Sequence, residues 1–375
     1  MHDPHDARLL VSIVQERWDE AERLVRQRAP DSASFVALCV HADVPSWVHD
    51  SLTRHGRAEL VGSEVLEGLE RIRRKVQRDN LLLIAQAERS LDLLLEAGVV
   101  PVALKGLDLL HRVYPQFDVR TIDDVDLLVR EEQLRAAIAA LERGGWRLPP
   151  EPRRTHYIRS SHHLPLRSPG EIGVDFELHW NLAQEMRFRV DGPGLFERAV
   201  PLDVAGRRIL RLDDQDLVAH LLLHHLTHYF DRRLKWAVDL RMIAGAPGFR
   251  WETVGRRIRA WNAVAACGMA LVHLRKMVPD WIPAEALAEL PVAGWRRLVT
   301  WPLRSSHPLE LFRQTRRRSV RLVLAAVLLD NPGLLPRWLM HRAVRDRRPG
   351  RHPLEGEVTS ARPSADERSP RTPEG

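Results

Sequence analysis

The sequence predicts an α/β fold, and the order of four segments carries that prediction. Residues 99–104 are an apolar run typical of a buried strand, and residues 124–129 alternate with a period of two. A helical pattern follows each strand, around residues 107–113 and at residues 131–143, where Gly144 and Gly145 end it. Strand, helix, strand, helix is the order of an α/β unit.

Helical regions are expected on both sides of this unit. Residues 64–97 carry apolar side chains three and four positions apart, and Gly98 is well placed to end that helix. Helices are expected again from Leu212, where Asp213 and Asp216 resemble an N-terminal cap with acidic support. The expected organisation is an N-terminal helical region (1–97), an α/β core (98–205), a C-terminal helical domain (206–345) and a disordered tail rich in Pro, Arg and Ser (346–375).

Composition narrows the possible partners. The 375 residues carry a net charge of +7 and a pI of about 10.0, which favours anionic partners such as nucleotides. The basic residues are spread along the chain, so nucleic acid is not expected as a partner. Cys39 and Cys267 have no metal-ligand spacing, no signal peptide is recognisable, and the longest apolar run (322–329) is too short to span a bilayer. A cytoplasmic protein without a transmembrane segment is expected.

The strand at residues 124–129 carries two carboxylates on one face. Asp124 and Asp126 are two positions apart, which corresponds to roughly 6.6 Å of backbone. Two such charges at about 4 Å repel by about 4 kcal/mol at an effective dielectric near 20. A solvated strand face is the alternative, but Asp is depleted in strands. The pair therefore predicts a Mg²⁺ site, because Mg²⁺ is held by one or two carboxylates together with substrate phosphates.

A second alternating segment supplies a third acid. It covers residues 172–178, after a turn at 168–171, and places Asp175 and Glu177 on the same face. Either acid could complete a site of two cations about 3.5–4 Å apart and help deprotonate an acceptor hydroxyl. The alternative is a partly exposed edge strand, and the alternation alone does not choose between the two acids.

The turn after the first strand is a candidate phosphate site. Gly106 at a helix N-terminus permits close approach of a phosphate to backbone N–H groups, and Lys105 adds a point charge. A plain strand-to-helix turn is the alternative, and the Walker A pattern is absent. Arg120 could contact a phosphate with two hydrogen bonds or pair with a neighbouring acid, and both interpretations stay open.

Histidines recur on one expected helix in the C-terminal half. His220, His224 and His228 are four residues apart, a spacing that can hold a metal ion, and His225 lies beside them. Half-buried histidines at a domain interface are favoured over metal-dependent hydrolysis there. On the next helix, Asp239 could orient one of them or help bind an acceptor substrate.

Several short motifs together resemble the uncharacterised bacterial nucleotidyltransferase family of the polymerase-β-like superfamily. The resemblance covers roughly residues 75–245. It rests on Leu104-Lys-Gly106, Tyr114-Pro115, Arg120-Thr-Ile-Asp-Asp-Val-Asp-Leu-Leu-Val129, Glu177-Leu-His-Trp180, Leu221-Leu-Leu-His-His225 and Leu234-Lys-Trp-Ala-Val-Asp-Leu240.

This resemblance implies a small mixed sheet flanked by helices. Asp124 and Asp126 match the metal-binding pair, Gly106 matches the glycine of the phosphate-contacting turn, and Glu177 matches the acid of the acid-Leu-His-Trp motif. Glu177 therefore ranks above Asp175. Lys105 stands where the broader superfamily usually has a first glycine, and the gap to the acid pair is longer.

The implied activity is transfer of a nucleoside monophosphate from a nucleoside triphosphate, with two Mg²⁺ ions and release of pyrophosphate. The acceptor is a small molecule, a peptide or a protein, and some family members lie beside genes for modified-peptide biosynthesis. The helical C-terminal half, with His224 and Asp239, is expected to form much of the acceptor site. The nucleotide, ATP or another, stays open. The alternative is a non-catalytic module of the same fold that binds a nucleotide or a partner protein.

Overall fold

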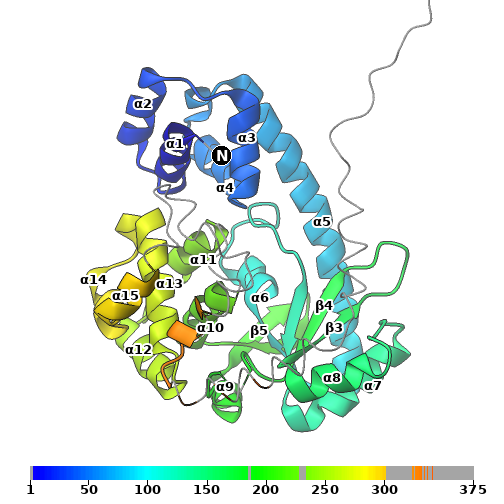
Figure 1. The fold of residues 1–375 in the computed structure, drawn as a ribbon. Helices are drawn as coiled ribbons and strands as arrows, with labels where there is room; N and C mark the ends of the chain where they lie inside the picture. The colour runs from blue at the N-terminus through cyan, green and yellow to red at the C-terminus, as the bar shows by residue number, and fades with distance from the viewer. Residues whose placement is uncertain are drawn as a thin grey trace, which may run out of the picture. The chain divides into compact units, whose positions relative to one another are not determined.

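A mixed sheet of six strands, in the order β3-β4-β2-β1-β6-β5, organises the computed structural model (Figure 1). Strand β1 pairs antiparallel with β2 and parallel with β6, and β2 pairs parallel with β4. The outer pairs β3·β4 and β5·β6 are antiparallel. The strands are β1 (Val102–Ala103), β2 (Val125–Leu128), β3 (His163–Arg167), β4 (Asp175–His179), β5 (Val200–Val204) and β6 (Arg207–Arg211). The predicted α/β class with a mixed sheet flanked by helices is confirmed.

The structure describes residues 3–184, 187–227 and 234–300, and further along the chain 323–324, 326–331, 333, 336 and 340. His228 and the expected tail at residues 346–375 lie outside these residues. Residues 1–332 form one compact unit. The domain boundaries expected inside it, after residues 97 and 205, stay predictions. No helix within the described ranges is long and apolar enough to cross a membrane.

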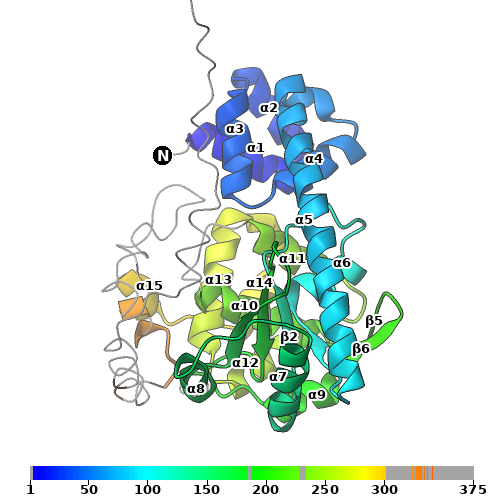
Figure 2. The ribbon, with the colours of Figure 1, turned by 90° about the vertical axis from the view of Figure 1, so that its right-hand side faces the viewer.

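The predicted N-terminal helices are confirmed, and the longest of them reaches the sheet. Helix α5 packs against α3 and α4 near its start and against α7 and β6 further along (Figure 2). Its buried Asn80 donates to the carbonyls of Phe117 and Arg120 at 2.5 and 2.7 Å and accepts the N–H of Ile122 at 3.1 Å. These helices are α1 (Pro4–Val14), α2 (Trp18–Gln27), α3 (Ser32–His41), α4 (Pro45–Arg54), the 3₁₀ turn η1 (Ala58–Leu60) and α5 (Ser63–Glu96).

Shorter helices connect the strands. The helices expected near 107–113 and 131–143 are found as α6 and as η2 followed by α7. The sequence reasoning did not anticipate helix α8 or the hairpin β5·β6. The hairpin turns at Ala205 and Gly206, which both have positive φ (51° and 83°), as a tight two-residue turn requires. The connecting helices are α6 (Lys105–Arg112), η2 (Glu131–Gln133), α7 (Leu134–Arg143), α8 (Arg153–Ser160) and α9 (Gly192–Arg198).

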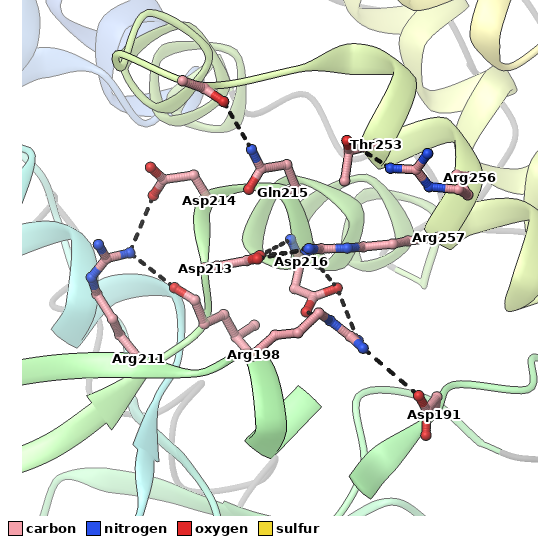
Figure 3. Close-up of polar contacts among 12 residues, drawn as sticks. Asp191, Arg198, Arg211, Asp213, Asp214, Gln215, Asp216, Thr253, Arg256 and Arg257 are labelled. Atoms are coloured by element: carbon pink, nitrogen blue, oxygen red, sulfur yellow. Dashed lines mark hydrogen bonds and ion pairs between the residues drawn. The ribbon is translucent and has the colours of Figure 1, made fainter. Parts of the chain in front are cut away.

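Between residues 214 and 300 the described chain is helical, as predicted, and a charged network fixes the start of its first helix. Asp213 accepts the N–H of Asp216 at 2.8 Å, which confirms the predicted cap of α10. Arg257 donates to the Asp213 carboxylate at 2.7 Å, and Arg198 donates to Asp216 at 2.9 Å (Figure 3). The helices are α10 (Asp214–Thr227), α11 (Lys235–Ala244), α12 (Trp251–Ala260), α13 (Val264–Met277), η3 (Pro279–Trp281), α14 (Ala284–Glu289) and α15 (Gly294–Thr300).

Candidate active site

The register of β2 against β4 brings the predicted acids together. Asp126 is the parallel-ladder partner of Glu177, so the two side chains project from the same face of adjacent strands, which lie about 4.8 Å apart. Asp124 lies one residue before β2 on the same face. Asp175 starts β4 two positions before Glu177. Carboxylates from two strands therefore line one patch of the sheet.

Two basic side chains contact Asp126. Lys105 Nζ lies 2.8 Å from Asp126 Oδ1, and His179 Nε2 lies 3.0 Å from the same oxygen. His179 Nε2 also lies 3.2 Å from Glu177 Oε2, so this ring bridges the two acids. Burial alone would raise the pKa of Asp126, but the charge of Lys105 and the His179 hydrogen bond lower it. Burial opposes protonation of His179, yet its hydrogen bonds to Asp126 and Glu177 raise its pKa to about 9.

Asp124 has a different environment. Its carboxylate has no hydrogen-bond or ion-pair partner among the described residues, although the side chain is largely enclosed. Burial, and then repulsion from Asp126, raises its pKa to about 8. A carboxylate that is enclosed, unpaired and next to a second acid is what a divalent cation would neutralise. The residues present therefore fit a Mg²⁺ ion held by Asp124 and Asp126.

The Lys-Gly turn is shaped by tight packing. Lys105 opens α6 with a positive φ of 42°, and the Leu104 N–H donates to the Asp126 carbonyl at 3.1 Å. A Cβ on Gly106 would lie 1.8 Å from Ile122 Cγ2. Only glycine fits that contact, and the residue before it, Lys105, places its ammonium on Asp126. The acids Asp126, Asp124 and Glu177 raise the pKa of Lys105 against the effect of burial, so the ammonium stays charged.

Arg120 and Asp239 form one buried ion pair. Arg120 Nε and Nη2 donate to the two Asp239 oxygens at 2.7 and 2.8 Å, and the Tyr114 hydroxyl donates to Oδ1 at 2.6 Å. Both side chains are almost fully buried. Of the two interpretations left open for Arg120, pairing with an acid is the one seen in this structure. The pair joins the segment before β2 to α11.

The predicted histidine helix presents one ring toward the site. His220 is 2% exposed, and in the part of the chain that the structure describes both ring nitrogens lack a hydrogen-bond partner. Burial, and then the charges of Lys105 and His179, hold its pKa well below its usual value. His224 lies with its ring centroid 6.0 Å from that of His220 and 5.7 Å from that of Trp236. His225 instead stacks on His273, with 2.6 Å between Nε2 and Nδ1. Within the described ranges, groups of three side chains with metal-ligand geometry occur on β2, β4 and the start of β3, and none on α10.

Several positioning residues escaped the sequence reasoning. The side chain of Asn80 forms hydrogen bonds to the backbone of the loop before β2 and so holds that loop in place. Lys235 Nζ lies 2.6 Å from Asp43 Oδ2 and 3.2 Å from Asp123 Oδ2, so it joins α11 to the same loop. His163, on β3, lies 3.6 Å from Glu177 Oε1. Only His179 gave a signal in the sequence, since it follows Glu177 by two residues and shares its strand face.

Comparison with known proteins identifies the sequence family. The model of a family described as "Uncharacterised nucleotidyltransferase" matches residues 12–279. A search of curated proteins finds no match.

Two solved structures show a weak likeness. The antibiotic-resistance factor ANT(2'')-Ia is 14% identical with a TM-score of 0.35, covering 48% of this chain and 91% of that one. An antigenic nucleotidyltransferase-like protein from Paracoccidioides brasiliensis is 13% identical with a TM-score of 0.31, covering 58% and 94%. Both scores are too low to carry an argument.

Proposed function

Because the chain belongs to the uncharacterised nucleotidyltransferase family, we propose that it transfers a nucleoside monophosphate from a nucleoside triphosphate to an acceptor, with Mg²⁺ bound at the acids. Asp124 and Asp126 would hold the metal, and Glu177 would complete the site. The observation that supports this most is the register of Asp126 beside Glu177, with Asp124 enclosed on the same face and unpaired within the described ranges. The chain would act in the cytoplasm.

The chain's own residues have separate roles in this proposal. Bound Mg²⁺ supplies positive charge to the triphosphate oxygens and to the leaving pyrophosphate. Lys105 Nζ, already 2.8 Å from Asp126, would supply a fixed cation at the turn, next to Gly106. An acceptor oxygen attacks the α-phosphorus, the bond from the α-phosphorus to the bridging oxygen breaks, and pyrophosphate leaves. Glu177, with its side chain 29% exposed, accepts the acceptor's proton.

The acceptor site would lie on the helical C-terminal half. His224 is half-buried beside His220, whose pKa responds to the charges of Lys105, His179, Asp126 and Glu177. These charges act on His220, which supports an acceptor site at this part of α10. Asp239 would shape the acceptor site indirectly, by holding Arg120 in place, because both of its oxygens accept hydrogen bonds from that guanidinium. A small molecule, a peptide, for example in modified-peptide biosynthesis, or a protein side chain could be accepted there.

The test is a transfer assay in which the acceptor is supplied by cell extract. The four nucleoside triphosphates, each labelled in the α-phosphate, are incubated with Mg²⁺ and extract, and the labelled product is identified by mass. Incorporation with one of them, abolished in Asp126→Asn and sharply reduced in Glu177→Gln, supports the proposal. Asp175→Asn is the matched control for the third acid, and it should retain activity. Full activity in Asp126→Asn would remove that residue from the mechanism.

A non-catalytic nucleotide-binding module is the second candidate. One observation favours this candidate: the positive charges of Lys105 and His179 already neutralise Asp126 and Glu177, so these two acids need no metal ion. Calorimetry with a triphosphate analogue, run beside a pyrophosphate-release assay, separates the two candidates. Binding with no pyrophosphate release in the presence of extract would support the module.

A further inference from the structure

Three histidines cluster at the edge of the acid patch. His163 on β3 is the antiparallel register partner of His179 on β4, so the two rings share one face of the sheet. His162 precedes β3, and its carbonyl accepts the Trp180 N–H at 3.0 Å, which fixes its backbone beside the end of β4. The ring centroids of His162 and His163 are 4.7 Å apart, and those of His163 and His179 are 5.1 Å apart.

The ring nitrogens converge on a common point. One nitrogen from each of His162, His163 and His179 lies within 4.8 Å of the other two. The Glu177 carboxylate lies beside them, 3.2 Å from His179 Nε2 and 3.6 Å from His163 Nε2. Two nitrogens of the cluster, His162 Nδ1 and His179 Nδ1, are buried with no hydrogen-bond partner among the described residues, which is costly unless another ligand satisfies them.

The geometry points to a binding site for one divalent transition-metal ion of the zinc class, held by His162, His163 and His179, with a water molecule as the fourth ligand. Imidazole nitrogen suits zinc, cobalt and nickel, whereas Mg²⁺ demands oxygen ligands. Three imidazoles and one water molecule are the four ligands that a zinc-class ion takes in an open tetrahedral site. The side chains of His163 and Glu177 are 24% and 29% exposed, so an ion can enter from solvent.

This site is separate from the proposed Mg²⁺ site. The Mg²⁺ position depends on Asp124 and Asp126, and the histidine position uses neither. Glu177 and His179 lie beside both positions, because His179 Nε2 is 3.0 Å from Asp126 Oδ1 and 3.2 Å from Glu177 Oε2. The inference does not rest on nucleotidyl transfer, because binding of the ion alone is measured.

The experiment uses the full-length chain without a histidine tag. The protein is stripped with a chelator and titrated with Co²⁺, whose visible absorption bands report tetrahedral coordination, and then Zn²⁺ is added in competition. One equivalent of Co²⁺ is expected, displaced by Zn²⁺ but not by excess Mg²⁺. His162→Asn and His163→Asn should each weaken binding by at least about tenfold. His55→Asn, just after the end of α4, is the histidine control, and Asp124→Asn should keep the transition metal.

The outcomes are distinguishable. No Co²⁺ bands with the wild-type chain, or unchanged binding in both histidine variants, would overturn the inference. Unchanged binding would instead place the ion at Asp126, Glu177 and His179, the other group with ligand geometry. If the variants do not fold, X-ray absorption of the wild-type zinc complex decides: three imidazole ligands support the site, and fewer contradict it.

Discussion

Asp126 and Glu177 are register partners on the parallel strands β2 and β4, although they lie far apart in the sequence. This pairing places two acids on one sheet face, with His179 bridging them at 3.0 and 3.2 Å. Lys105 completes the contacts from the turn before α6. The bridging ring and the ammonium offset two of the carboxylates, whereas Asp124 has no partner among the residues that the structure describes. That imbalance supports the proposal of a cation beside Asp124.

Replacing Asp124 separates stability from metal binding. In the chelated protein, Asp124→Asn should unfold at an equal or higher temperature than the wild type, because it removes an enclosed charge repelled by Asp126. Mg²⁺ should raise the unfolding temperature of the wild type and leave that of the variant unchanged. Thermal unfolding with EDTA and with Mg²⁺ measures both effects. An equal Mg²⁺ shift in both proteins would rule out Asp124 as a ligand.

Adding a methyl group at Gly106 should displace the Lys-Gly turn. The new Cβ would lie 1.8 Å from Ile122 Cγ2, so Gly106→Ala should lose about 1–3 kcal/mol of unfolding free energy by overpacking. Ile122→Ala makes room for the methyl group. Adding Gly106→Ala to the Ile122→Ala variant should therefore cost less unfolding free energy than adding it to the wild type. Urea unfolding of the four proteins gives the coupling energy. Strictly additive losses would contradict the contact.

The buried ion pair between Arg120 and Asp239 is expected to stabilise the fold rather than to contact the acceptor. Asp239→Asn leaves a buried guanidinium without its counter-charge, for which we expect a loss of about 3–5 kcal/mol in urea unfolding. Glu252→Gln, which removes the exposed pair with Arg256, should cost at most about 1 kcal/mol. If Asp239→Asn kept the stability of the wild type and raised only the KM for the acceptor, the prediction would be wrong. Asp239 would then contact the acceptor directly.

A buried histidine away from the acids should make the fold sensitive to low pH. Burial, and then the charge of Lys276, lower the pKa of His273 to about 3 from 6.5. Above pH 6.5 the ring is neutral in both states. Between pH 6.5 and 3 the unfolded chain binds a proton that the folded chain does not, so stability falls by about 1.4 kcal/mol per pH unit.

Urea unfolding across pH 5–8 measures this dependence. His273→Asn should have a shallower slope below pH 6.5 than the wild type, and His55→Asn serves as the matched control. Parallel slopes for His273→Asn and the wild type would show that His273 does not titrate in this way.

Local patterns predicted the elements that their own residues specify. The spacing of apolar residues predicted α5, and the alternation around Asp124 and Glu177 predicted β2 and β4. The hairpin β5·β6 was missed because its turn, Ala205-Gly206, lacks the Asn or Asp typical of such turns, and Pro201 interrupts the first strand.

Contacts across the sheet could not be predicted in the same way. No spacing in the sequence shows that His163 lies opposite His179, because that depends on strand register. The same holds for Asn80, whose partners lie in the loop before β2. For the same reason the sequence could not decide whether Arg120 contacts a phosphate or an acid, since its partner Asp239 is on a helix far along the chain.

The most direct test of the metal and triphosphate site needs no acceptor. A triphosphate analogue with a non-cleavable α–β bridge is titrated calorimetrically into the wild type, Asp126→Asn and Asp175→Asn, with Mg²⁺ and with EDTA. The account predicts Mg²⁺-dependent binding in the wild type and in Asp175→Asn, and its loss in Asp126→Asn. Binding that is equally tight in EDTA, or unchanged in Asp126→Asn, would contradict it.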